Sequence, residues 1–309
     1  MGKIFNIHGL PIESTLELDK EIVWFREILK KEGLSPKINS NLNKSLNRAY
    51  EIAQLSKSNA GGSIDENIVE DMRYLLGVSS LIKTIRRLYS LPEPPEWLNK
   101  DLRLFVKGQV PFTMPYKRLA KTDFIWEFIV ASRLASFCSV YKQEPDIVCN
   151  MRSTKFSIAC KMIWTKNKKQ WLNTLSVASR QIEKAEGKRG YIAVDYSPII
   201  DHKKYFRFTG TAEQPSYLDF KNKESPTYAL DKDLRDIINE LKASEIEDRI
   251  RYGYSGEYKR EKCRAVIFFA RTVLTIQGIP ATLQRGAYLP LGIMDEFDEV
   301  IHRNLDRSQ

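Results

Sequence analysis

The chain has 309 residues, of which 42% are hydrophobic and 28% are charged, and such values are ordinary for a globular protein. No stretch of about 18 apolar residues is present, so the sequence excludes a membrane-spanning helix. The formal net charge of +10 favours a polyanionic partner such as nucleic acid over small acidic ligands.

The N-terminal segment MGKIFNIHGLPIEST lacks the charged and then apolar layout of a signal peptide, which predicts a cytoplasmic protein. The four cysteines and three histidines are scattered and form no CxxC or HxxxH motif. We therefore do not expect a zinc site, and we interpret the cysteines as buried free thiols.

The N-terminal third of the chain has a helical pattern. Residues 16–31, 43–55 and 64–89 carry apolar side chains at three- and four-residue spacing, which predicts three helices. The following LPEPP, residues 91–95, cannot continue a helix. We expect an N-terminal helical domain over residues 1–115, which either packs as a cap or binds nucleic acid or a partner protein.

The pattern changes after residue 115, and from about residue 121 helical and strand-like segments alternate. Alternation of this kind predicts an α/β layer architecture, here a mixed β-sheet flanked by helices over residues 116–309. In chain order we expect a helix, two strands, a helix and a strand, at residues 122–137, 144–150, 155–164, 169–186 and 190–197.

The C-terminal part of this region is less informative. Residues 231–250 predict one amphipathic helix. Residues 264–276 predict a long strand or a pair of strands, which the Gly-Ile-Pro segment at 278–280 would end.

Charged side chains interrupt two of the apolar segments. Glu127 lies within FIWEFIV, and because burying an unpaired carboxylate is costly, it either lies on a polar helix edge or has a compensating partner. Lys161 lies within SIACKMIWT, where strand alternation places it on the same face as Ala159. The hairpin of residues 144–164 would bring Asp146 close to this face, which is compatible with a metal-and-water site.

The order of these residues resembles the PD-(D/E)XK nuclease superfamily, which has a restriction-endonuclease-like fold. The resemblance covers about a quarter of the chain, roughly residues 121–200. The PD at 145–146 resembles the first element of the family motif, and the ACK at 159–161 falls on the (D/E)XK element. The SRQ at 179–181 resembles the glutamine-bearing helix of many members, and the apolar strand after it resembles the next core strand.

The resemblance implies a phosphodiesterase that uses Mg²⁺ or Mn²⁺ to cleave nucleic acid, with DNA favoured over RNA. It implies metal binding by the carboxylates of Asp146 and Glu127 and by the backbone carbonyl of Cys160. It implies that Lys161 positions a water and stabilises the developing charge. Gln181 would orient the substrate or a neighbouring strand.

The resemblance also implies a cellular context. Nucleases of this superfamily commonly work beside a helicase, an ATPase or a specificity subunit, often in bacterial restriction or antiviral defence, and an oligomer is compatible with this role. The basic run that follows the Lys161 strand would contact nucleic acid through Lys166, Lys168 and Lys169.

Position 159 departs from the family pattern, because the pattern has Glu or Asp there and this chain has Ala. Alanine cannot bind a metal ion, so the site keeps at most the carboxylates of Asp146 and Glu127. One interpretation, which we favour, is an engineered Glu-to-Ala change that leaves a metal-dependent nuclease inactive or weakened. The alternatives are a naturally degenerate nuclease fold kept for binding nucleic acid or protein, a migrated acid such as Asp195, or a chance match.

Overall fold

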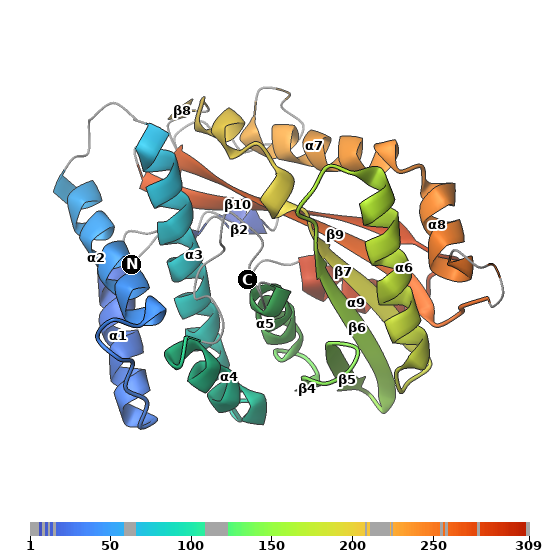
Figure 1. The fold of residues 1–309 in the computed structure, drawn as a ribbon, viewed down its shortest axis with the longest axis horizontal. Coiled ribbons are helices and arrows are strands. Elements are labelled where there is room, and N and C mark those ends of the chain that lie inside the picture. Colours follow the sequence, from blue (N-terminus) through green and yellow to red (C-terminus); the bar gives the residue numbers. More distant parts are fainter. Residues whose placement is uncertain are drawn as a thin grey trace. The chain divides into compact units, whose positions relative to one another are not determined.

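A computed structural model gives the fold of the chain (Figure 1). Its described residues are 6–7, 10–11, 13–14, 17–58, 66–108, 123–207, 209–210, 223, 225–253, 256, 259–276 and 279–306. The chain forms two compact units, each built from segments that are distant in sequence. Unit 1 comprises Met1–Ile125, Asp201–Tyr228 and Thr272–Leu283, and unit 2 comprises Trp126–Ile200, Ala229–Arg271 and Gln284–Gln309.

Unit 1 contains the predicted N-terminal helices. They are α1 (Leu18–Lys31), α2 (Asn41–Ser58) and α3 (Glu66–Tyr89), followed by α4 (Glu96–Val106), which the sequence reading missed. The three predicted helices are confirmed, and they pack on one another through buried residues such as Ile22 and Phe25 of α1. The Pro-rich segment before α4 supplies Pro95 as the residue that precedes its first turn.

Short strands complete the described part of unit 1. Strands β1 (Asn6–Ile7) and β2 (Leu10–Pro11) pair antiparallel, and β3 (Glu13–Ser14) pairs antiparallel with residues 281–282. The 3₁₀ helix η2 (His202–Arg207) packs on α3, and β8 (Thr209–Gly210) pairs in parallel with residues 275–276. No helix in the described part of the chain is long and apolar enough to cross a membrane.

Unit 2 is an α/β structure, as the alternating pattern predicted. Its first part contains the predicted helix, strands, helix and strand in that order, with one additional short strand after the first helix. These elements are α5 (Asp123–Leu134), β4 (Ser139–Tyr141), β5 (Ile147–Met151), β6 (Thr154–Met162), α6 (Lys168–Lys184) and β7 (Arg189–Asp195). The 3₁₀ helix η1 (Ser197–Ile199) follows.

The main sheet is mixed. It also contains β9 (Cys263–Ile276) and β10 (Ile279–Pro290). In the described residues its strand order is β3-β10-β9-β7-β6-β5-β4, with β8 beside β9. Strands β4, β5 and β6 pair antiparallel, whereas β6, β7 and β9 pair in parallel. Strand β6 is therefore an interior strand, and its penultimate residue, Lys161, lies at the carboxyl end of the parallel strands.

Because side chains alternate in direction along β6, they contact two different helical layers of unit 2. Phe156 contacts Phe297 of α9 (Glu296–Asp306), and the side chain of Trp126 of α5 donates a hydrogen bond to the carbonyl of Ala193. On the opposite face, a Cβ at Gly190 would clash with Ile182 of α6. Helices α5 and α9 thus cover one face, and α6 covers the face that carries Ala159 and Lys161.

The C-terminal elements differ from the sequence prediction. The single helix expected at residues 231–250 is wrong, because the chain forms α7 (Pro226–Glu240) and α8 (Ala243–Tyr252), separated at Lys242, which has a φ of 47°. Strand β9 (Cys263–Ile276) is one long strand. Strand β10 (Ile279–Pro290) includes Pro280, which was expected only to end the preceding strand.

The domain boundary expected between residues 115 and 116 falls outside the described residues. The two compact units are interleaved in sequence, since residues 201–228 and 272–283 group with the N-terminal segment. The α/β character and the mixed sheet of unit 2 therefore form across three segments of the chain rather than one.

Candidate functional site

Asp146 and Lys161 meet at the carboxyl end of β6, as the predicted hairpin required. The Nζ atom of Lys161 donates to Oδ2 of Asp146 at 3.0 Å, and the backbone N–H of Cys160 donates to the same oxygen at 2.7 Å. Both side chains are largely shielded, with exposed fractions of 15% for Lys161 and 14% for Asp146. The pair is thus an anchored, mostly buried ion pair, not a loose contact on the surface.

The local chain course explains why an aspartate lies there. Strand β5 begins at Ile147, which pairs with Ile158, so Asp146 precedes the first ladder residue. The amide of Cys160 lies just beyond that ladder and would lack a strand partner. The carboxylate of Asp146 accepts it and so extends the hydrogen-bonding pattern by one position.

Burial makes the ionised form of Asp146 unfavourable. It raises the pKa of Asp146 above its ordinary value of 3.8, and the opposing effects of Lys161 and the Cys160 amide only reduce this increase. A carboxylate that the fold holds in an unfavourable environment is a frequent property of functional sites, although structural ion pairs also show it.

Several charged groups affect the pKa of the Cys160 thiol. Burial, followed by the negative charges of Asp146 and Glu127, raises the pKa of Cys160, while the positive charges of Lys161 and Lys142 lower it. Glu127 of α5 is partly exposed and acts on the same buried thiol as Asp146. The structure brings Asp146 and Lys161 into direct contact, whereas Glu127 and Lys142 act on the thiol of Cys160 from the α5 side of the sheet, and Lys142 was not among the predicted residues.

Ala159 and Gln181 have different surroundings. Ala159 is fully buried, pairs with Ile192 of β7 and offers no oxygen to a ligand. Gln181 lies in α6, and its side-chain oxygen is buried with no hydrogen-bond partner in the described structure. The contacts of Asp146 and Lys161 do not include Gln181, so its expected orienting role stays a prediction.

The three lysines expected to bind nucleic acid surround the first turn of α6. Lys166 and Lys169 are exposed, whereas Lys168 forms an ion pair with Glu245 of α8 at 2.6 Å. The first turn of α6 contains no acidic residue, and Asn167 caps the helix by accepting a hydrogen bond from the amide of Gln170. The positive charge of this turn is therefore reduced by one exposed ion pair.

Asp195 is engaged elsewhere and does not replace an acid at position 159. It is fully buried at the end of β7, accepts a hydrogen bond from the Ser197 amide and forms an ion pair with Arg271 at 2.9 Å. Arg271 also lies over the ring of Trp126, 5.6 Å from its centroid. In register, Asp195 pairs with Met162 and so lies on the α5 face, opposite to Lys161.

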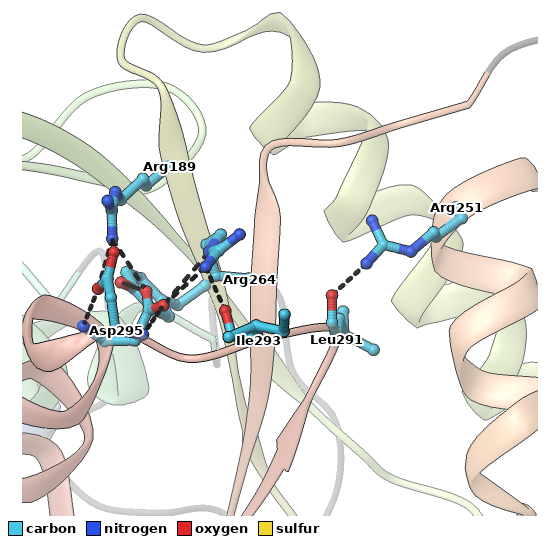
Figure 2. Close-up of polar contacts among 8 residues, drawn as sticks. Arg189, Arg251, Arg264, Leu291, Ile293 and Asp295 are labelled. Carbon is cyan, nitrogen blue, oxygen red and sulfur yellow. Dashed lines mark hydrogen bonds and ion pairs between the residues drawn. The ribbon is translucent and has the colours of Figure 1, made fainter.

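A second polar cluster anchors the segment between β10 and α9 (Figure 2). Arg264 contacts Asp298 at 3.0 Å and the Ile293 carbonyl at 2.6 Å, and Arg189 contacts Asp295 at 2.6 Å. The hydroxyl of Tyr191 donates to Asp298 at 2.6 Å. Because these charges satisfy one another, we interpret the cluster as a structural clamp. The sequence reading missed it, since its members are distant along the chain.

The donor set can be compared with the needs of a divalent cation. Within the described residues, no group of three or more His, Cys, Asp or Glu side chains is arranged to hold a metal ion. Three of the four cysteines are buried as predicted, and Cys138 is partly exposed. The carboxylate of Asp146 and the backbone carbonyl of Cys160 are hard oxygen donors, which fit Mg²⁺, an ion that often binds through one or two carboxylates together with substrate phosphates.

The sequence matches no family model, and neither the curated proteins nor the solved structures that were compared with it contain a significant match. A function can therefore be inferred only from the residues of the site and from the order of its elements.

Proposed function

We propose that the chain is a metal-dependent nuclease of the PD-(D/E)XK type, weakened by alanine at position 159, with the reactive site at Asp146 and Lys161. The observation that carries the proposal is the shielded ion pair of these residues, anchored by the Cys160 amide at the carboxyl end of parallel strands. Ligand sites of α/β proteins commonly lie at this end of the strands.

The arrangement of elements supports the same proposal at the level of the fold. Helix α5, strands β5 and β6, helix α6 and strand β7 occur in this order, with the short β4 between α5 and β5. This order resembles that of the superfamily core. The parallel pairing of β6 with β7 and the antiparallel pairing of β5 with β6 give a mixed sheet that is compatible with a restriction-endonuclease-like fold.

Each residue of the site has a role in this proposal. Asp146 and Glu127 would hold a divalent cation together with the carbonyl of Cys160. Such an ion, when bound, lowers the pKa of a water and neutralises charge on a phosphate. Lys161, whose ammonium group donates to Asp146 Oδ2, would also donate to the phosphate or the attacking water. DNA is the preferred substrate of the proposal, and a helicase, an ATPase or another subunit its expected partner.

Two observations favour a second function. Ala159 is fully buried and supplies no ligand, and the described residues contain no group of three acidic, His or Cys ligands. Both features suit a subunit that binds nucleic acid or a protein partner without cleaving. Metal dependence separates the two functions, because a binding subunit keeps its affinity in a chelator, whereas cleavage by a nuclease stops.

The deciding experiment restores the missing acid. The Ala159→Glu variant is assayed for Mg²⁺- and Mn²⁺-dependent cleavage of plasmid, linear and single-stranded DNA and of RNA, beside the unchanged chain. Asp146→Asn and Lys161→Ala are introduced in the same background as matched controls. We expect cleavage that needs the glutamate, the aspartate and the lysine; a folded Ala159→Glu variant that cleaves none of the substrates, or does so equally well without Lys161, contradicts the proposal.

A further inference from the structure

Helix α6 carries a row of basic side chains on the side that faces solvent. Lys169, Asn173, Arg180 and Lys184 are all exposed, and their spacing places them along one face of the helix. The row extends from Lys169 to Lys184, which is about 22 Å along the helix axis. In the described part of the chain, neither Arg180 nor Lys184 forms an ion pair. The row therefore presents positive charge to the solvent.

The segment before β9 adds two basic side chains beside this row. Nη1 of Arg260 donates to the carbonyl of Ser176 at 2.8 Å, and Nζ of Lys262 donates to the carbonyl of Ala185 at 2.8 Å. Because Ser176 and Arg180 are four residues apart on α6, Arg260 lies next to Arg180. Burial and, after it, the positive charge of Arg180 lower the pKa of Arg260, as expected for neighbouring like charges.

The charges of Arg180 and Arg260 are not neutralised by a carboxylate ion pair within the described residues. The acceptors of Arg260 are neutral, namely the carbonyls of Ser176 and Ile250 and the Ser176 hydroxyl. Glu183 is the only acidic residue of α6; it accepts a backbone amide at 3.2 Å and only partly offsets the two charges. Two adjacent guanidinium groups suit a phosphate, because each can donate two parallel N–H groups to its oxygens.

The length and direction of the row fit a polymer of phosphates. About 22 Å corresponds to roughly six base-pair steps of a duplex, whereas a single anion would occupy only one part of the row. Trp171 in the first turn of α6 contacts Tyr196 just after β7, and Ile182 in the last turn lies against Gly190 near the start of β7. The Lys169 end of the row therefore lies at the carboxyl end of the parallel strands, where the candidate site is.

We propose that Lys169, Arg180 and Lys184 of α6, with Arg260 and Lys262 beside them, form a docking surface for the phosphodiester backbone of double-stranded nucleic acid. Arg180 and Arg260 bind one phosphate between them, and the lysines contact phosphates on either side. Docking needs neither a metal ion nor cleavage, so the inference goes beyond the proposed function and does not rest on it.

The test measures binding of a fluorescent duplex DNA oligonucleotide to the full chain in EDTA, over a series of salt concentrations. For Arg180→Gln we expect affinity about tenfold lower near about 0.1 M salt, and a dependence of log affinity on log salt concentration less steep by about 0.9, as for one lost phosphate contact. Lys184→Gln should give a loss of similar size, and Arg180→Lys, which keeps the charge, should retain most of the affinity. Circular dichroism and thermal unfolding establish that each variant is folded.

Arg303→Gln is the matched control. Arg303 is 65% exposed on α9, which covers the opposite face of the sheet from α6. The change in net charge is identical to that of Arg180→Gln, and we expect little loss of affinity. Equal losses for Arg303→Gln and Arg180→Gln would show a general charge effect and overturn the inference, as would unchanged affinity and salt dependence in Arg180→Gln.

Two further outcomes separate this inference from a membrane surface and from the proposed nuclease. Sedimentation with phosphatidylserine vesicles that Arg180→Gln weakens, together with an unchanged affinity for the oligonucleotide, would assign the surface to a membrane and overturn the inference. Loss of oligonucleotide binding in Arg180→Gln, together with no cleavage by Ala159→Glu, would refute the nuclease and support the docking surface. Cleavage by Ala159→Glu with oligonucleotide binding that Arg180→Gln leaves unchanged would refute the docking surface alone.

Discussion

The buried carboxylate of Asp146 gives a prediction whose sign follows from its environment. Burial raises the pKa of Asp146 above 3.8 despite the hydrogen bonds from Lys161 and the Cys160 amide. The folded protein therefore holds this proton to a higher pH than the unfolded chain does. The contribution of this group to the free energy of unfolding is fully present below its unfolded pKa, and is lost as the pH rises through the folded pKa.

The Asp146→Asn variant removes this titration and keeps an oxygen that accepts the Cys160 amide. We expect the free energy of unfolding of Asp146→Asn, minus that of the unchanged chain, to become more positive as the pH rises from 3.8, the ordinary pKa of an aspartate, through the raised pKa of Asp146 in the folded protein. Asp146→Ala removes the acceptor as well. It should be less stable than Asp146→Asn by about 1–3 kcal/mol, the cost of leaving the shielded amide of Cys160 without a partner.

Urea denaturation followed by tryptophan fluorescence measures both differences, provided that the dependence of stability on urea is the same for all variants. A difference between Asp146→Asn and the unchanged chain that stays constant or falls with rising pH would refute the sign of the argument. Equal stability of Asp146→Ala and Asp146→Asn would show that the Cys160 hydrogen bond does not stabilise the fold.

Two further predictions concern the frame that holds the site. Gly190→Ala should lower the free energy of unfolding by about 1–3 kcal/mol, because the new Cβ would lie 2.2 Å from Cγ2 of Ile182. A melting temperature equal to that of the unchanged chain would contradict this packing. Arg264→Ala should lower the free energy of unfolding by about 2 kcal/mol, because its partner Asp298 is only 1% exposed. Arg303→Ala removes an exposed ion pair with Glu299 and should lower the free energy of unfolding by less than about 0.5 kcal/mol in the same urea assay.

The elements around the site could be predicted from the sequence because each has a clear period and a clear end. The apolar run of β6 and the amphipathic pattern of α6 determine their types, and the hairpin predicts the contact of Asp146 with Lys161 that the structure contains. The break between α7 and α8 could not be predicted in this way. It occurs at Lys242 without a glycine or proline nearby, so no local signal marks it.

The charge environment of the site depends on contacts between distant segments, which a sequence pattern does not define. The burial of Asp195 with Arg271 excludes Asp195 as a replacement acid, yet in the sequence Asp195 is only a charge at the end of one apolar segment and Arg271 only a charge within another. Lys142 carries no motif at all, and its position over the ring of Phe128 in α5 depends on packing between segments that are distant in the sequence. The sequence signal that identified Lys161, a charged residue inside an apolar strand, is equally present at Arg271.

The central claim is that Asp146 and Lys161 form the reactive site of a nuclease that lacks an acid at position 159. Its most direct test is the rate of Mg²⁺-dependent DNA cleavage by purified Ala159→Glu, compared with the unchanged chain and with Ala159→Glu carrying Asp146→Asn. We predict cleavage by the first that exceeds the second, and loss of that cleavage in the third and in EDTA. A folded Ala159→Glu that binds Mn²⁺ and DNA without cleaving, or that cleaves equally with Asp146→Asn, would contradict the account.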